Sequence, residues 1–178
     1  MRVLILVCFL VAGTTASAQQ GKSAAETTGD RLQVLIPLAG YGATFIMDDT
    51  EGRTQFYKSF FMNLGITYTL KYSINDKRPD NHGGQSFPSG HTSAAFQGAA
   101  FIQNRYGWAY GIPAYLGAAY VGYSRVEGET DRHYVDDVLA GAVIGILSSY
   151  YFTTPYKGVI ITPVADDGYY GIAIGKRW

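Results

Sequence analysis

The chain has 178 residues, with 14 basic and 14 acidic side chains and therefore no formal net charge. This length suits one domain with a substantial core and is too short for two, and the balanced charge lacks the basic footprint of a nucleic-acid-binding protein. The 15 tyrosines and 22 glycines are typical of closely packed helices that meet boundaries between water and an apolar phase.

The N-terminus has the pattern of a secretory signal peptide. A charged start precedes an apolar run over residues 3–12, and Ala16-Ser17-Ala18 is a small-residue cleavage pattern. We expect residues 1–18 to be removed on export, together with Cys8, which would leave no thiol for a disulfide or for catalysis. A retained membrane anchor is the alternative. The polar residues 19–30 are expected to form a flexible leader.

Five stretches rich in apolar residues predict five helices. Their expected bounds are 32–47, 53–74, 91–104, 108–124 (interrupted or kinked near Pro113) and 137–152. The long connections between the second and third helices and between the fourth and fifth are polar. The fold class expected is therefore all-α, a bundle of about five core helices within residues 31–157.

The C-terminal residues differ in kind from the helices. Residues 158–163 are rich in β-branched side chains, residues 165–168 have turn composition, and residues 169–174 again favour a strand. This order predicts a β-hairpin within residues 158–178.

The sequence leaves two relations to a membrane open. Residues 106–124 and 138–156 are each nineteen residues without a charge, long enough to cross a bilayer. If they cross it, both long polar connections fall on the same side. The opposite side would then carry the acidic loop at 48–51, against the tendency of the cytoplasmic side to be basic. This loop and a mean hydropathy of +0.00 favour instead a compact bundle of buried helices.

Two groups of polar residues are expected close together at one end of the helices. Lys71 and Arg78 are seven residues apart, so a helix continued to Arg78 would carry both cations on one face. Ser89, Gly90 and His91 begin the third helix, where unpaired N–H groups and the helix dipole favour an anion such as phosphate. Taken singly, these are also the patterns of a solvated basic helix end and of a capped turn.

A third group lies at the same end. Arg125 follows the fourth helix, and His133 and Asp137 are four residues apart, one helical turn. A carboxylate that holds one imidazole nitrogen fixes the tautomer and leaves the other nitrogen nucleophilic. A capped helix start with an incidental ion pair would give the same pattern. Together, however, the three groups supply what phosphoryl transfer without a metal requires.

In order along the chain, these residues resemble a known signature, that of the type 2 phosphatidic acid phosphatase (PAP2) superfamily. The matching pattern is Lys71, six residues, Arg78-Pro79; Pro88-Ser89-Gly90-His91; and Ser124-Arg125 with His133, three residues, Asp137. The superfamily includes lipid phosphate phosphatases, bacterial class A acid phosphatases and vanadium haloperoxidases. The resemblance covers about residues 55–150. One departure is the seven residues between Arg125 and His133, where the family usually has five.

The resemblance implies a mechanism. His133 would attack phosphorus and form a phosphohistidine, with Asp137 orienting its ring, and His91 would protonate the leaving alkoxide and then activate water. The phosphoryl oxygens would be bound by five groups: Lys71, Arg78, Arg125, the Ser89 hydroxyl and the Gly90 amide. No metal or other cofactor is implied.

We therefore expect a phosphatase facing the periplasm, in or on the inner membrane, acting on a phosphomonoester or diphosphate. A lipid substrate is favoured, of the phosphatidic acid, phosphatidylglycerol phosphate, undecaprenyl diphosphate or lipid A type. The alternatives are a soluble periplasmic acid phosphatase, a vanadate-dependent haloperoxidase and a non-catalytic helical membrane protein that binds anions. No nucleic-acid partner is expected.

Overall fold

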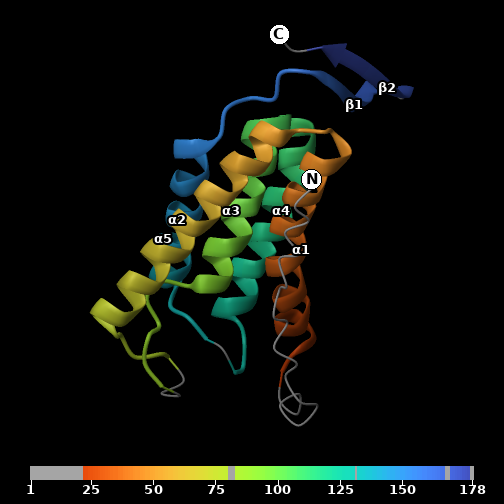
Figure 1. The fold of residues 1–178 in the computed structure, drawn as a ribbon. Coiled ribbons are helices and arrows are strands. Elements are labelled where there is room, and N and C mark those ends of the chain that lie inside the picture. Colours follow the sequence, from red (N-terminus) through yellow and green to blue (C-terminus); the bar gives the residue numbers. More distant parts are fainter. Residues whose placement is uncertain (1–21, 80–82, 131, 167–168, 177–178) are drawn as a thin grey trace.

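A computed structural model of the chain describes residues 22–79, 83–130, 132–166 and 169–176, and shows a bundle of upright helices with a hairpin at one end (Figure 1). The helices are α1 (Ala24–Ile46), α2 (Thr50–Ile74), α3 (Gly90–Tyr106), α4 (Trp108–Val126) and α5 (Val135–Phe152). Strands β1 (Val159–Asp166) and β2 (Tyr169–Lys176) pair antiparallel. The predicted fold class is confirmed. The signal peptide predicted for residues 1–18 lies outside the described residues.

The first helix begins earlier than predicted. α1 starts at Ala24, so residues 24–30 are helical rather than a flexible leader. The cause is a capping box: the Ser23 hydroxyl accepts from the Glu26 N–H, and the Glu26 carboxylate accepts from the Ser23 N–H. The other helices lie within three residues of their predicted bounds, and α4 continues through Pro113 as one helix.

α3 is the central helix and packs against all four others. Each of its residues is buried or half-buried. The buried apolar side chains form two clusters around it, one of Ile36, Ala95, Ala99, Ala118 and Val121 and one of Phe56, Phe101 and Tyr106. Because α3 begins at the predicted phosphate-binding turn, the core of the bundle fixes the position of that turn.

α3 and α5 approach each other so closely that their backbones are in contact at two glycines of α5. A Cβ atom on Gly141 would lie 2.5 Å from the Ser89 carbonyl oxygen, and one on Gly145 would lie 2.4 Å from the Ser93 carbonyl oxygen. Glycines four residues apart let helix backbones approach directly. This approach holds the start of α5 beside the start of α3.

Buried polar side chains connect α2 to α3. The hydroxyls of Thr67 and Ser93 are 2.8 Å apart, and the Ser93 hydroxyl donates to Asn63 Oδ1. One turn further along, Gln97 donates to the Ser59 hydroxyl. The pairs bring polar groups together inside the bundle, where an unpaired polar group would be costly.

The end of the bundle remote from the predicted site is held by a buried ion pair. Arg105 and Asp49 are 2% and 3% exposed, and the guanidinium donates to both carboxylate oxygens. Asp49 also caps α2 through the Gly52 N–H. Burial alone would raise the pKa of Asp49, but the hydrogen bonds from Arg105 and Gly52 and the charge of Arg105 hold it below its ordinary value.

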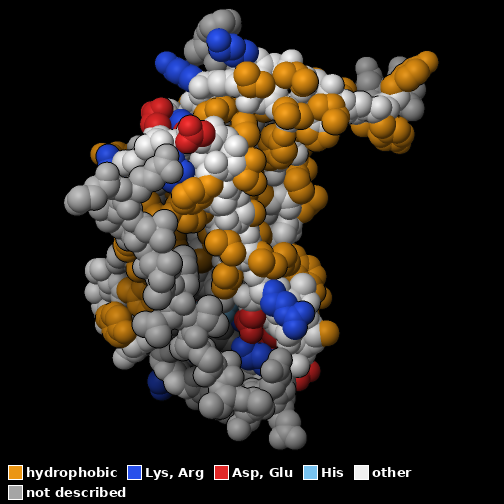
Figure 2. Space-filling view, turned by 45° about the vertical axis from the view of Figure 1, so that its right-hand side comes forward, with side chains coloured by type: hydrophobic (Ala, Val, Ile, Leu, Met, Phe, Trp, Pro, Cys, Tyr) orange, Lys and Arg blue, Asp and Glu red, His pale blue; other side chains and the backbone are white. Residues whose placement is uncertain are grey.

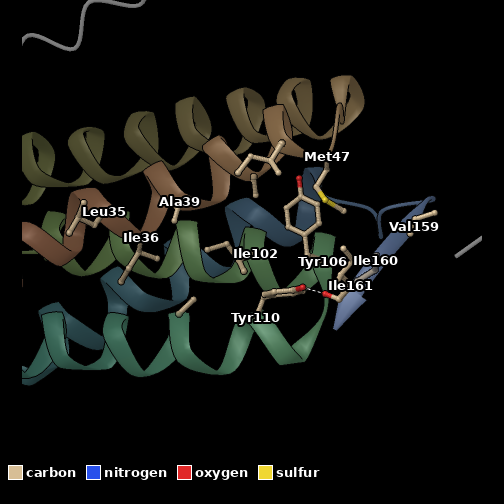
Figure 3. Close-up of a pocket in the computed structure, with 13 residues that line it drawn as sticks. Leu35, Ile36, Ala39, Met47, Ile102, Tyr106, Tyr110, Val159, Ile160 and Ile161 are labelled. Carbon is tan, nitrogen blue, oxygen red and sulfur yellow. Dashed lines mark hydrogen bonds between the residues drawn. The ribbon is translucent and has the colours of Figure 1, made fainter. Parts of the chain in front are cut away.

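The hairpin lies at this same remote end (Figure 1). Ile160 is its buried anchor, and the Tyr110 hydroxyl donates to the Ile161 carbonyl. Between β1 and helices α1, α3 and α4 is an apolar cavity of about 580 Å³ (Figure 3). Its lining carries no charged side chain, so we assign it no part in acid–base or nucleophilic chemistry.

We predict that Gly145→Ala lowers the free energy of unfolding by about 1–3 kcal/mol, because the new methyl group overpacks the α3–α5 contact. Gly65→Ala is the matched control, since a Cβ there meets nothing within 4 Å and the helix gains about 0.5–1 kcal/mol from losing a glycine. Urea titration of both variants measures the difference. Equal stabilisation by both substitutions would contradict the packing described.

Arg105→Ala should destabilise the protein by about 3–5 kcal/mol, because it leaves the Asp49 carboxylate buried without its cation. Lys58→Ala, at an exposed position on α2, is the control and should change stability little. In the unsubstituted protein the folded-state pKa of Asp49 is lowered, so the stabilisation is present above the ordinary carboxyl pKa of about 4 and is lost as the pH falls further. Thermal unfolding between pH 7 and pH 3 should show this loss in the parent and little of it in Arg105→Ala.

Candidate active site

The three predicted groups of residues meet at the end of the bundle opposite the hairpin. This end comprises the C-termini of α2 and α4 and the N-termini of α1, α3 and α5 (Figure 1). On the face seen in Figure 2, acidic and basic side chains lie toward both ends of the bundle, and hydrophobic side chains lie between them. The site is therefore formed by loops and helix ends.

His133 and Asp137 form the buried centre of the site. Their side chains are each 1% exposed, and His133 Nδ1 lies 3.3 Å from Asp137 Oδ2. On the other side of the ring, the Arg78 guanidinium lies 3.5 Å from Nε2. A carboxylate accepts hydrogen bonds and does not donate them, so Nδ1 carries the proton and Nε2 the lone pair. The pairing thus leaves the nitrogen that carries the lone pair beside a cation.

Ser86 is a member of this centre that the sequence did not single out. Its hydroxyl donates to Asp137 Oδ2 over 2.5 Å and lies 3.4 Å from His133 Nδ1. The Tyr134 N–H donates to the same oxygen. These donors fix the orientation of the carboxylate that holds the imidazole. In sequence, Ser86 is one of several polar residues in a loop, and no spacing rule distinguishes it.

The predicted phosphate-binding turn is tied directly to α5. The Ser89 N–H donates to the Asp137 carbonyl over 2.9 Å. The Ser89 hydroxyl is the N-cap of α3, 3.4 Å from the Thr92 N–H and 3.0 Å from the Thr92 hydroxyl. Gly90 is the first residue of α3. The turn therefore has the helix-start geometry expected of an anion site, with the Ser89 hydroxyl also serving the helix.

Lys71 and Arg78 reach the site by different routes. α2 ends at Ile74, followed by Asn75 in the left-handed conformation (φ 49°), so the helix does not continue to Arg78, which extends from the following loop. Lys71 is buried, and its amine donates to the Gln85 carbonyl over 2.7 Å. Lys71 thus holds the loop that carries Ser86.

His91 and Arg125 share a partner, Asp30, which lies on α1. His91 Nε2 is 3.3 Å and Arg125 Nη1 is 3.1 Å from Asp30 Oδ1. Arg125 is fully buried and also donates to the Glu26 carbonyl. Burial alone would raise the pKa of Asp30, but the contact with His91, the hydrogen bond from Lys22 and the charge of Arg125 lower it below the usual carboxyl range.

Asp30 and Glu26 were not among the predicted site residues, because residues 19–30 were expected to form a flexible leader. Ser23 and Glu26 have the S-x-x-E spacing of a capping box, which would have placed the helix start correctly and extended α1 toward the site.

The longer connection between Arg125 and His133 is accommodated without separating them. The His133 N–H donates to the Arg125 carbonyl over 2.9 Å, which closes the loop at its base. Within the loop, the N–H and the hydroxyl of Thr130 both donate to the Glu26 carboxylate. Thr130 therefore docks this loop on the first turn of α1.

Among the residues that the structure describes, no three His, Cys, Asp or Glu side chains come together in a way that could hold a metal ion. The cations of the site are suited to an anion, since Arg78 lies beside His133 and Arg125 shares Asp30 with His91.

Comparison with known proteins places this geometry in a family. The sequence profile of the PAP2 superfamily matches residues 48–158. The chain belongs to the PAP2 superfamily. A lipid A 1-phosphatase of Porphyromonas gingivalis is 40% identical over 87 residues, which is 47% of this chain and 19% of that protein. The chain thus covers about a fifth of that relative's length.

Two solved structures resemble this PAP2 protein. The crystal structure of Aquifex aeolicus LpxE aligns with a TM-score of 0.55 at 22% identity, covering 68% of this chain and 83% of that one. The transmembrane PAP2 type phosphatidylglycerolphosphate phosphatase of Bacillus subtilis aligns with a TM-score of 0.45 at 23% identity, covering 79% and 87%. The first of these alignments supports the helical-bundle fold.

We predict that Ser86→Ala lowers kcat/KM by roughly tenfold, because the carboxylate that orients His133 loses a hydrogen bond to a charged group. Ser148→Ala is the matched control: Ser148 is also buried, and its hydroxyl has no hydrogen-bond partner among the described residues. Steady-state kinetics on one phosphate ester measures both. Equal activity of the two variants would show that the Ser86 hydroxyl has no part in orienting the site.

Proposed function

We propose that this PAP2 protein is a metal-independent phosphatase that hydrolyses a lipid phosphomonoester or diphosphate through a phosphohistidine on His133. One observation carries the proposal: the buried His133 ring has Asp137 at Nδ1 and Arg78 beside Nε2. A nucleophile held by a carboxylate, with a cation where the phosphoryl oxygens would lie, is the arrangement that phosphoryl transfer needs.

In the first step, the Nε2 lone pair attacks phosphorus and the bond from phosphorus to the leaving oxygen breaks. His91 gives its proton to that oxygen, so that the product leaves as an alcohol. Asp137 stabilises the positive charge that develops on the His133 ring. Arg78 and the N–H groups at the start of α3 stabilise the negative charge on the phosphoryl oxygens.

In the second step, His91, now neutral, takes a proton from water as the water oxygen attacks phosphorus. The bond from phosphorus to His133 Nε2 breaks, and inorganic phosphate is released. The lone pair returns to Nε2, while Asp137 keeps Nδ1 protonated. Both histidines end in their starting states.

A lipid substrate is supported by what the bundle exposes. The interior contacts rest largely on small and polar residues, whereas large apolar side chains on α1, α2, α4 and α5 face outward, among them Leu35, Phe61, Leu116, Leu139 and Leu147. An outward apolar surface around helices packed through small residues suits contact with acyl chains. Figure 2 shows such side chains on the flank of the bundle. By length and composition, α5 is the one described helix that passes as a candidate membrane span.

The proposal extends to substrate class and location. The similarity to a lipid A 1-phosphatase makes a lipid A-type phosphate the first substrate to test, ahead of phosphatidic acid, phosphatidylglycerol phosphate and undecaprenyl diphosphate. Export by the predicted signal, association with the inner membrane and a site that faces the periplasm complete the proposal.

His133→Ala should reduce phosphatase activity by at least about a thousandfold, because the covalent route needs a nucleophile at that position. Acid-labile ³²P should be trapped on the protein in the parent and not in this variant. Tyr134→Phe, at an exposed neighbouring side chain, is the control and should retain activity. Full activity of His133→Ala, or activity that EDTA abolishes, would overturn the mechanism.

The same purified protein, assayed in detergent, tests the substrate class. The lipid phosphates named above should be hydrolysed with kcat/KM values well above those for soluble phosphomonoesters such as glycerol phosphate. The reverse order would identify a soluble acid phosphatase.

A further inference from the structure

We infer that Asp30 is a positioning residue for the acid–base step: its carboxylate holds His91 at Nε2 and thereby assigns proton transfer to Nδ1. This inference rests on the proposed function. It concerns a residue outside the region that the PAP2 profile matches, which begins at residue 48. The carboxylate that would direct the second histidine thus comes from a helix that lies outside the matched region.

The contacts of Asp30 support this role. Asp30 Oδ1 lies 3.3 Å from His91 Nε2 and 3.1 Å from Arg125 Nη1, and Oδ2 lies 2.6 Å from Lys22 Nζ. The contact with His91 is an ion pair by distance, since Oδ1 has no hydrogen-bond partner of regular geometry among the described residues. A negative charge beside Nε2 favours the ring form that carries a proton on that nitrogen. His133 and Asp137 make the corresponding pair through Nδ1. Each histidine would thus have its own carboxylate, on opposite ring nitrogens.

The position of Asp30 is built into the packing of α1. The preceding residue, Gly29, is buried where α1 crosses the end of α4, and a Cβ there would lie 2.1 Å from the Ser124 hydroxyl oxygen. Glu26 fixes the same turn, because its carbonyl accepts from Arg125 and its carboxylate accepts from Thr130. Asp30 is therefore held on a rigid helix turn, as a positioning residue requires.

The second partner, Arg125, gives the proposal a way to be tested. Loss of the Asp30 contact to Arg125 would weaken phosphate binding equally for every ester. Loss of the contact to His91 would instead weaken protonation of the leaving oxygen, which matters for a poorly leaving alcohol and little for a phenol that leaves unaided. The two effects are separated by the dependence of kcat/KM on the leaving group, because kcat/KM reports the phosphorylation step, whereas hydrolysis of the phosphohistidine is the same for every ester.

The experiment compares Asp30→Asn with the parent on an alkyl phosphate and on p-nitrophenyl phosphate. We expect kcat/KM to fall roughly ten- to hundredfold more on the alkyl ester than on the aryl ester, a part of what general acid–base catalysis contributes. Asp48→Asn is the matched control, the same chemical change at a fully exposed side chain at the other end of the bundle, and should leave both values unchanged. Equal losses on the two esters would overturn the proposal.

Two further measurements make the outcome specific to His91. In a His91→Ala background, Asp30→Asn should change the ratio of kcat/KM on the alkyl ester to that on the aryl ester less than about twofold; an undiminished change of this ratio would show that Asp30 acts elsewhere. In ¹⁵N NMR spectra of the histidine rings, Asp30→Asn should shift the His91 nitrogens and leave those of His133 in place, and unchanged His91 shifts would refute the contact. Asp30→Glu, which keeps the charge, replaces the Asn variant if that one does not fold, and should lower kcat/KM more on the alkyl ester than on the aryl ester, by less than about tenfold.

These outcomes distinguish this inference from the proposed function. An inactive parent protein would refute the phosphatase proposal, whereas an active parent whose Asp30→Asn variant shows no leaving-group effect would refute only the role of Asp30.

Discussion

The site depends on how closely α5 approaches α3. Glycine at 141 and 145 lets the two backbones touch at Ser89 and Ser93, and at the end of this contact the Ser89 N–H donates to the Asp137 carbonyl. The residue that orients the proposed nucleophile is therefore bonded through its own backbone to the turn proposed to hold the phosphate. A larger side chain at either glycine would separate the nucleophile from the anion site, however well each was formed alone.

The bundle interior is also not a conventional apolar core. The buried positions between α2 and α3 are occupied by Ser59, Asn63, Thr67, Ser93 and Gln97, which pair with one another. Large apolar side chains are then left on the outside. Small and polar residues inside the bundle allow its helices to pack closely, and the large apolar residues outside form a surface suited to lipid.

Much of this arrangement could be predicted from the sequence, for identifiable reasons. Stretches rich in apolar residues predicted four of the five helices to within three residues, and the β-branched residues after Pro155 predicted the hairpin. The ordered motifs brought Lys71, Arg78, Ser89, His91, Arg125, His133 and Asp137 to one end, because each lies at or near a helix terminus. The start of α1 differs from the prediction because the capping box of Ser23 and Glu26 begins a helix within a stretch of polar composition. Ser86 and Asp30 could not be found, since their partners are 51 and 61 residues away in sequence and no local pattern encodes that contact.

Residues of α1 contribute contacts to the site. The region matched by the PAP2 profile contains the histidines and cations, yet the described contacts of Arg125 with Asp30 and Glu26, and that of His91 with Asp30, involve residues before it. The longer loop before His133 docks on the same turn of α1 through Thr130 and Glu26. Four residues further along α1, Asp30 contacts both His91 and Arg125. The start of the first helix thus joins the loop before His133, the cation at the end of α4 and the histidine at the start of α3.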